Sequence, residues 1–298
     1  MLDVLADPIL PVFAIAALGY GLGRAGLADM SEARAVNRFA MTVPLPVLVF
    51  GLIASAPIER FQPGALAAYA LVEGLFFAGG YRLARRVLGR APDEAVLLAF
   101  CGIFANNAFF VLPIALFLHG PDNVIGITQV ITLDSTVTFA GSIMALQLIA
   151  SGRVGPAVVA RTMVRSPIIV AIVVGLLVAA LGIPLPSSVD TFVFFTGAAA
   201  APLGLFALGV VLSGTVFGRD PAVLVFSTIK LVCFPAAIAA AIWLVGGAEG
   251  ARFVLASAGP SGTMAFSLAL LYGVRTEAIA QIVLATSVLS LPLLAALA

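Results

Sequence analysis

Long runs of hydrophobic residues, separated by short polar segments, follow one another along the whole chain. A helix needs about 20 apolar residues to cross the hydrocarbon layer of a membrane, and most of the runs have about this length. The pattern predicts an all-α membrane protein with ten transmembrane helices. They are expected near residues 8–23, 36–54, 64–84, 95–118, 124–150, 167–182, 190–213, 222–245, 251–272 and 277–297.

The composition excludes a soluble protein. Of the 298 residues, 62% are hydrophobic and only 10% are charged, whereas a soluble domain has about 25% charged residues. The net charge of +1, with scattered basic residues, indicates no nucleic-acid partner. Cys101 and Cys233 lie inside apolar runs, and His119 is the single histidine, so neither a disulfide nor a metal site is expected. Membrane lipid is therefore the expected surrounding of the chain.

The basic residues predict the orientation in the membrane. Twelve of the fifteen cationic residues lie at odd-numbered loops between the predicted helices, and only Arg60 and Arg252 lie at even-numbered loops. Loops rich in Lys and Arg stay in the cytoplasm. We therefore expect a multi-pass protein of the cell inner membrane with both termini outside.

The two halves of the chain resemble each other, which predicts an internal repeat. Pro44 in the second helix and Pro202 in the seventh are each followed by Leu and, seven residues after the proline, by Gly. Both prolines are expected to break their helices. Because each half has five predicted helices, residues 1–150 and 167–298 would form two inverted repeats, joined by a cytoplasmic linker over 151–166. Such repeats are typical of transporters. Chance similarity between Leu/Ala/Val-rich segments is the alternative.

The fourth and ninth predicted helices, which are equivalent in this repeat, contain polar and helix-breaking residues. The fourth has Asn106 and Asn107 followed by Pro113, and the ninth has Pro260 within residues 259–263. We expect two broken helices that meet near mid-membrane, where free N–H groups at helix N-termini would bind a carboxylate. Proline kinks stabilised by asparagine hydrogen bonds are the alternative. The predicted substrate-binding residues are Asn106, Asn107, Asp134, Pro260, Ser261 and Thr263.

Three charged residues lie well inside predicted transmembrane helices, away from their ends: Glu73, Asp134 and Lys230. An intramembrane charge costs at least about 2.5 kcal/mol, so such residues usually face a cavity or a partner. We expect these three to couple transport to protons or sodium ions. Two alternatives are that Lys230 extends to the membrane surface and that Asp134 belongs to a structural Ser/Thr hydrogen-bond network.

On these residues the sequence resembles the auxin efflux carrier family, which includes bacterial malonate and malate permeases and the plant auxin exporters. The resemblance covers essentially the whole chain and is carried by Asn106 with Pro113, by Pro202-Leu203 and by Gly259-Pro260. It implies a fold like that of the bile-acid sodium symporters, with a scaffold domain, a transport domain and crossed helices four and nine. It also implies substrate binding at this crossing and an elevator-type movement. The short linker resembles that of the bacterial branch, and the plant members suggest a homodimer.

The expected function is secondary active transport of small organic anions, such as malonate, malate or auxin-like acids. No cofactor is expected beyond a coupling ion, H+ or Na+. The chain has no Gly-x-x-x-x-Gly-Lys-Ser/Thr loop for ATP. An enzyme is not expected, because Ser261 has no histidine in any predicted helix to activate it. A sodium-coupled carrier of another organic solute and a passive channel are the alternatives.

Overall fold

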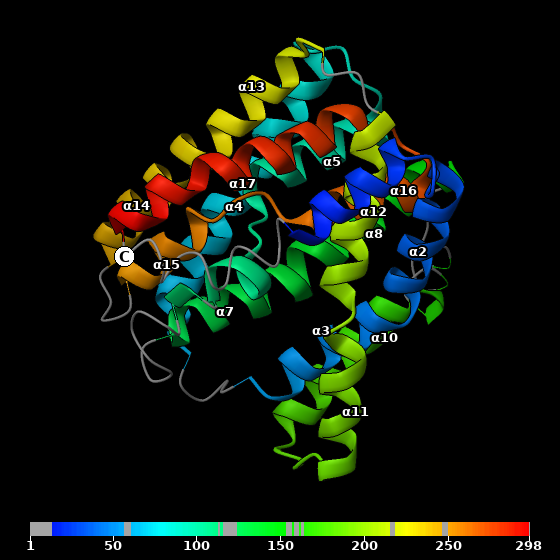
Figure 1. Cartoon of the computed structure of the whole chain (residues 1–298). Coiled ribbons are helices and arrows are strands. Elements are labelled where there is room, and N and C mark those ends of the chain that lie inside the picture. The colour runs from blue at the N-terminus through cyan, green and yellow to red at the C-terminus, as the bar shows by residue number, and fades with distance from the viewer. Residues whose placement is uncertain are drawn as a thin grey trace.

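The chain forms a bundle of helices from which a smaller group, including α11, projects at one end (Figure 1). The computed structural model describes residues 14–56, 61–112, 114–115, 124–152, 157, 161, 164–214, 218–245 and 250–297. Within these ranges the only β-type pairing is an isolated bridge between Ala105 and Ser261. The prediction of an all-α protein is therefore confirmed.

In the part of the chain that the structure describes, six helical stretches are long and apolar enough to cross a membrane, and their bounds lie close to those predicted. Several of them consist of two or three consecutive elements. The elements are α2 (Met30–Thr42) with α3 (Pro44–Ala54), α4 (Pro63–Arg86), α7 (Ile125–Leu133) with η4 (Asp134–Phe139) and α8 (Ala140–Ser151), α11 (Ser187–Gly197) with α12 (Ala200–Gly214), α13 (Pro221–Thr228) with η5 (Ile229–Cys233) and α14 (Phe234–Val245), and α17 (Glu277–Leu297).

The remaining predicted helices are shorter or interrupted. A helix covers residues 14–24 of the first, and α10 (Pro167–Ala180) covers the sixth. The fourth is divided into α5 (Pro92–Ile103) and η2 (Asn107–Val111), and the ninth into α15 (Gly250–Ser257) and α16 (Thr263–Tyr272). The three η elements are π-helices, which are wider than an α-helix and are frequent at functional sites.

Proline residues mark where many of these helices begin. A proline at the first position of a helix lacks an N–H that would have no partner there, so it is well tolerated. Pro44 begins α3 directly after α2 has ended at Thr42, and Pro202 lies in the first turn of α12, after α11 has ended at Gly197. The predicted helix breaker Pro113 lies outside the described residues.

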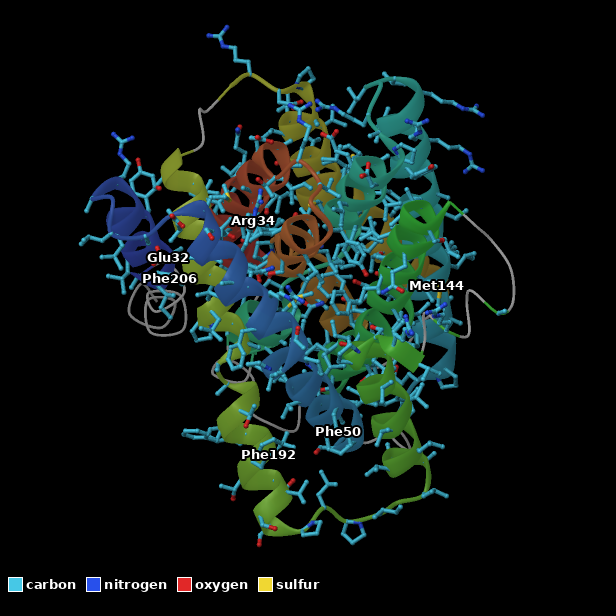
Figure 2. All side chains as sticks on the ribbon, turned by 90° about the vertical axis from the view of Figure 1, so that its right-hand side faces the viewer. Glu32, Arg34, Phe50, Met144, Phe192 and Phe206 are labelled. Carbon is cyan, nitrogen blue, oxygen red and sulfur yellow. The ribbon has the colours of Figure 1, made fainter. Side chains whose placement is uncertain are left out.

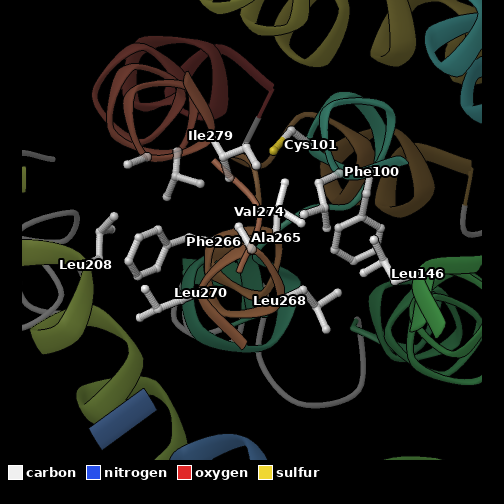
Figure 3. Close-up of a cluster of buried hydrophobic side chains, with 14 of the residues drawn as sticks. Phe100, Cys101, Leu146, Leu208, Ala265, Phe266, Leu268, Leu270, Val274 and Ile279 are labelled. Carbon is white, nitrogen blue, oxygen red and sulfur yellow. The ribbon is translucent and has the colours of Figure 1, made fainter. Parts of the chain in front are cut away.

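The core of the bundle surrounds α16 (Figure 3). Helix α16 contacts α2, α5, α12 and α17. Its Phe266 and Leu268 are fully buried, as are Phe100 of α5 and Ile279 of α17. The second part of an interrupted helix therefore occupies the centre of the molecule.

Many large apolar side chains point away from the bundle. Phe194, Phe195 and Trp243 are 79%, 82% and 82% exposed, and Phe192 of the projecting α11 points outward in Figure 2. Extensive apolar surface is unfavourable in water and stable in lipid. The exposed surface therefore agrees with a protein that crosses a membrane several times.

Candidate functional site

The two interrupted helices meet inside the bundle. Helix α5 ends at Ile103, the chain is extended at Phe104, and η2 begins at Asn107. Helix α15 ends at Ser257, and α16 begins only at Thr263. Both interruptions lie at the polar segments that the sequence singles out.

The extended segments between these half-helices pair with each other. The N–H of Asn106 donates to the carbonyl of Pro260 at 2.8 Å, and the N–H of Gly262 donates to the carbonyl of Phe104 at 2.9 Å. The pairing satisfies backbone groups that would otherwise lack partners in a water-free layer. Glycine is favoured at 262, because a Cβ there would clash with the ring of Phe104, at 2.6 Å from its Cδ1.

Ser261 holds the paired segments in place through its own polar groups. Its hydroxyl donates to the carbonyl of Cys101 at 2.7 Å, and its N–H donates to Oγ1 of Thr286 at 3.0 Å. Ser261 and Thr263 are buried, and neither lines the pocket described below. Pro260 contributes the carbonyl that accepts from Asn106. In this conformation Ser261 and Pro260 have structural contacts, and Thr263 is buried away from the pocket.

The ammonium group of Lys230 joins the carboxyl ends of both interrupted helices. Its Nζ donates to the carbonyl of Ile103 at 3.0 Å and to that of Ser257 at 2.8 Å, which are the last residues of α5 and α15. A helix C-terminus has unpaired carbonyls and a partial negative charge, which the ammonium compensates. Lys230 is 0% exposed. The alternative that it extends to the membrane surface is therefore wrong.

A pocket lies beside the paired segments, between α3, η4 and the start of α16. Its walls are mostly apolar, with four polar side chains, and its volume is about 50 Å³. This volume holds a water molecule or two, so an organic acid needs the pocket to widen. The lining residues are Leu45, Leu48, Val49, Leu52, Phe104, Ala105, Asn106, Asn107, Ala108, Ile131, Asp134, Ser135, Phe139, Gly262 and Met264.

Three of the predicted binding residues line this pocket: Asn106, Asn107 and Asp134. The side-chain amide of Asn107 donates to Oδ2 of Asp134 at 3.3 Å. No residue that the structure describes bonds to the side-chain amide of Asn106. Asn106 is therefore available to a ligand, whereas Asn107 positions the carboxyl group of Asp134.

The sequence did not point to several other lining residues. The pocket-facing residues of the second segment are Gly262 and Met264, and the apolar wall comes largely from α3. Apolar residues inside a membrane helix resemble all their neighbours in sequence, so no local signal separates a pocket wall from a packed core. Gly262 alone could have been predicted to line the pocket, because it directly follows Ser261, which the sequence predicts to bind substrate.

Glu73 of α4 reaches Asp134 across the helix interface. The two carboxyl groups interact electrostatically with each other, and Thr138 lies beside Glu73. Both carboxyl groups are buried, and the second oxygens, Oε1 of Glu73 and Oδ1 of Asp134, have no donor within the described part of the chain. The two groups therefore share a buried site.

Lys230 provides the positive charge nearest to this pair. It interacts electrostatically with Glu73 and Asp134, although no carboxylate that the structure describes lies within ion-pair distance of its ammonium. The three predicted coupling residues, from α4, η4 and η5, thus lie together although they are far apart in sequence. Two of them, and also Asn107, lie in π-helical turns.

The chain is similar to known membrane transport proteins over nearly its full length. A family model described as "Membrane transport protein" matches residues 4–297. The chain is also 28% identical, over 298 residues, to a protein of Rhizobium meliloti (strain 1021) named "Putative malonate transporter". That alignment covers 95% of this chain and 91% of the relative.

Proposed function

Because the chain belongs to the membrane transport protein family, that of the auxin efflux carriers, we propose that it is a secondary active transporter of small organic anions. Family and apolar helices together identify a membrane transporter and not an enzyme. The observation that carries the proposal is the pairing of two interrupted helices beside a pocket in which the amide of Asn106 has no partner among the described residues.

The pocket suits one carboxylate group. The amide of Asn106 supplies a hydrogen-bond donor, and Gly262 and Met264 place the N-terminus of α16 at the pocket wall. The first N–H groups of a helix are unpaired and carry partial positive charge, so they attract anions. The leucine-rich wall contributed by α3 would contact the apolar part of the same molecule.

We propose malonate, malate and auxin-like acids as candidate substrates, with malonate the first to test. The support for malonate is the name of the Rhizobium meliloti relative. The support for an acid in general is the donor set just described, which matches carboxylate oxygens. The four carboxylate oxygens of malonate exceed the donors at the wall, so a second group of donors would have to form when the pocket widens.

We also propose that the chain has ten transmembrane helices. They would form two inverted repeats, over residues 1–150 and 167–298. The equivalent places of α5–η2 and α15–α16 in the two halves support this arrangement. A scaffold domain and a transport domain that moves as an elevator are also proposed, because α3 packs with α10 and α11, while α4 packs with α5 and α14. Both termini would lie on the non-cytoplasmic side of the inner membrane. Two copies of the chain would form a homodimer through their scaffold domains.

Counterflow in proteoliposomes tests the proposed function. Vesicles containing the purified protein are loaded with unlabelled malonate, and uptake of external radiolabelled malonate is followed. A carrier returns to the outside faster when it carries substrate, so we expect labelled malonate to accumulate transiently above the external concentration. Uptake that never exceeds equilibrium and is not accelerated by internal malonate would indicate a channel. The control is the same vesicles without protein.

A further inference from the structure

We infer that Glu73 and Asp134 form a carboxyl pair that shares one proton and passes it between the substrate pocket and a second cavity. Lys230 is the fixed countercharge of this pair. The inference rests on the proposed transport function and specifies its coupling ion as a proton, not a sodium ion.

Each member of the pair faces a different cavity. Asp134 lines the pocket beside the paired segments. Glu73 lines a second cavity of about 250 Å³, which has no lining residue in common with the first. Thr138 and Ser142 are the polar members of its wall apart from Glu73, and Phe77 and Val137 are among its apolar members. The cavity is open where Gly74, Val137 and Gly141 are exposed, and its three polar groups can bond to water molecules that bring protons to Glu73.

Two buried carboxyl groups that share a site do not both stay ionised, so the pair of Glu73 and Asp134 holds a proton. An ionised carboxylate only accepts hydrogen bonds, so two of them cannot bond to each other unless one is protonated. Both lie in a buried site, and the other oxygen of each has no donor within the described residues. The other titratable or charged groups that face the pair are Lys230 on η5 and Tyr69 on α4. With Lys230 charged, one proton on the pair makes the cluster neutral, which burial favours.

Lys230 occupies a place that a coupling sodium ion would need. Transporters with discontinuous helices hold sodium with carbonyls at the C-terminal ends of the half-helices. Here two such carbonyls, of Ile103 and Ser257, accept from the ammonium of Lys230. A lysine is covalently attached and cannot cross the membrane with the substrate. The cation that moves must therefore bind elsewhere, and the carboxyl pair can take it as a proton.

The transfer is balanced in protons and charge. A hydronium ion in the second cavity gives a proton to Glu73: one of its O–H bonds breaks, it becomes water, and the O–H bond of Glu73 forms. Asp134 then gives its proton to a water molecule in the substrate pocket, so the O–H bond of Asp134 breaks and a hydronium ion forms there. The pair returns to one proton and one negative charge. The reverse order carries a proton the other way.

The test uses the purified full-length protein in proteoliposomes, with radiolabelled malonate as the probe and the membrane potential clamped at zero. Accumulation is measured with an imposed pH gradient and no sodium, and separately with a sodium gradient at equal pH. Counterflow is measured on the same vesicles. The variants are Glu73→Gln and Asp134→Asn. The matched control is Glu94→Gln, which also neutralises a buried carboxylate, but one that pairs with Arg90 outside both cavities.

We expect the pH gradient, and not the sodium gradient, to drive accumulation by the wild-type protein and by Glu94→Gln. Glu73→Gln should lose this accumulation to the level of protein-free vesicles yet retain counterflow, which needs no net proton movement and shows that the variant folds. The inference is overturned if Glu73→Gln and Asp134→Asn both keep accumulation driven by the pH gradient, or if sodium alone drives the wild type. Absence of counterflow in the wild type instead overturns the proposed function itself.

Infrared spectroscopy gives a second readout that does not require transport. A buried protonated carboxyl group has a C=O stretching band that ionised carboxylates lack. We expect this band in the wild type and in Glu94→Gln, and its loss or shift in Glu73→Gln. Identical spectra of the wild type and Glu73→Gln in this region would overturn the shared proton.

Discussion

The most unusual side chain in this protein is a lysine with no exposed surface. Lys230 donates to the last carbonyls of two separate half-helices, and its ammonium lies 5.0 Å from the centroid of the Phe234 ring. Buried charges are stable only when hydrogen bonds and opposite charge replace water. Two helix C-termini and the nearby carboxyl pair meet this requirement, so the lysine stabilises the interruptions on which the site depends.

Replacing Lys230 by Met should therefore destabilise the protein. Each hydrogen bond from a charged donor contributes about 1.5–3 kcal/mol, and the carbonyls would remain buried without partners. We expect the thermal midpoint of the purified Lys230→Met protein to fall by about 5 °C or more. Val232→Met is the matched control, because Val232 lies in the same π-helical segment and is 60% exposed. Equal midpoints for wild type and Lys230→Met would contradict this role.

The sequence singled out individual polar residues that the structure places near the interruptions. Asn106, Glu73, Asp134 and Lys230 stand out because amides and charges are rare inside apolar runs, and the structure brings all of them near the interruptions. Their partners could not be predicted. The carbonyl groups to which a lysine donates depend on how the helices pack. Helix packing cannot be predicted from a single amino-acid sequence.

At the scale of the elements, the interruptions depend on close approach of two backbones. Gly262 lies against the ring of Phe104, which stacks on Phe100 with 4.4 Å between the ring centroids. The ring cannot move away easily, because Phe100 is fully buried. A side chain at 262 would therefore clash with the ring of Phe104, which lines the pocket.

Gly262→Ala should lower stability and malonate affinity together. Overpacking of this kind costs about 1–3 kcal/mol, and the ring that it displaces lines the pocket. Thermal unfolding and equilibrium binding of malonate to the purified protein measure the two effects. Gly79→Ala is the control, because nothing lies within 4 Å of a Cβ at that position. Unchanged affinity in Gly262→Ala would show that the pocket is elsewhere.

The hydrophobic runs predicted the long helices better than the short ones. The six long stretches agree closely with the predicted ranges, because uninterrupted apolar runs end at charged or turn-forming residues. Helix α10 has 14 residues, about 21 Å at 1.5 Å per residue, which is shorter than a hydrocarbon layer of about 30 Å. A run of hydrophobic letters continues past Ala180, but Gly182 has a positive φ of 61° and ends the helix there.

At the scale of the whole molecule, the distribution of arginine predicts which loops face the cytoplasm. We expect the start of α13 to lie inside the cell and the start of α11 outside it. Single cysteines at Arg219 and Ser188, both exposed, can report this. In protein without Cys101 and Cys233, a membrane-impermeant thiol reagent should label Ser188→Cys in intact cells. It should label Arg219→Cys only after the cells are opened. The opposite pattern would invert the topology.

Binding of malonate to the purified wild-type protein and to Asn106→Ala, measured by isothermal titration, tests the central claim most directly. Loss of a hydrogen bond to a charged group costs about 1.5–3 kcal/mol, so the account predicts affinity lower by about ten- to a hundredfold. Gln147→Ala is the control, since this amide bonds to Tyr272 away from the pocket. Equal affinity of the wild type and Asn106→Ala, in proteins of equal stability, would contradict a carboxylate site at the interrupted helices.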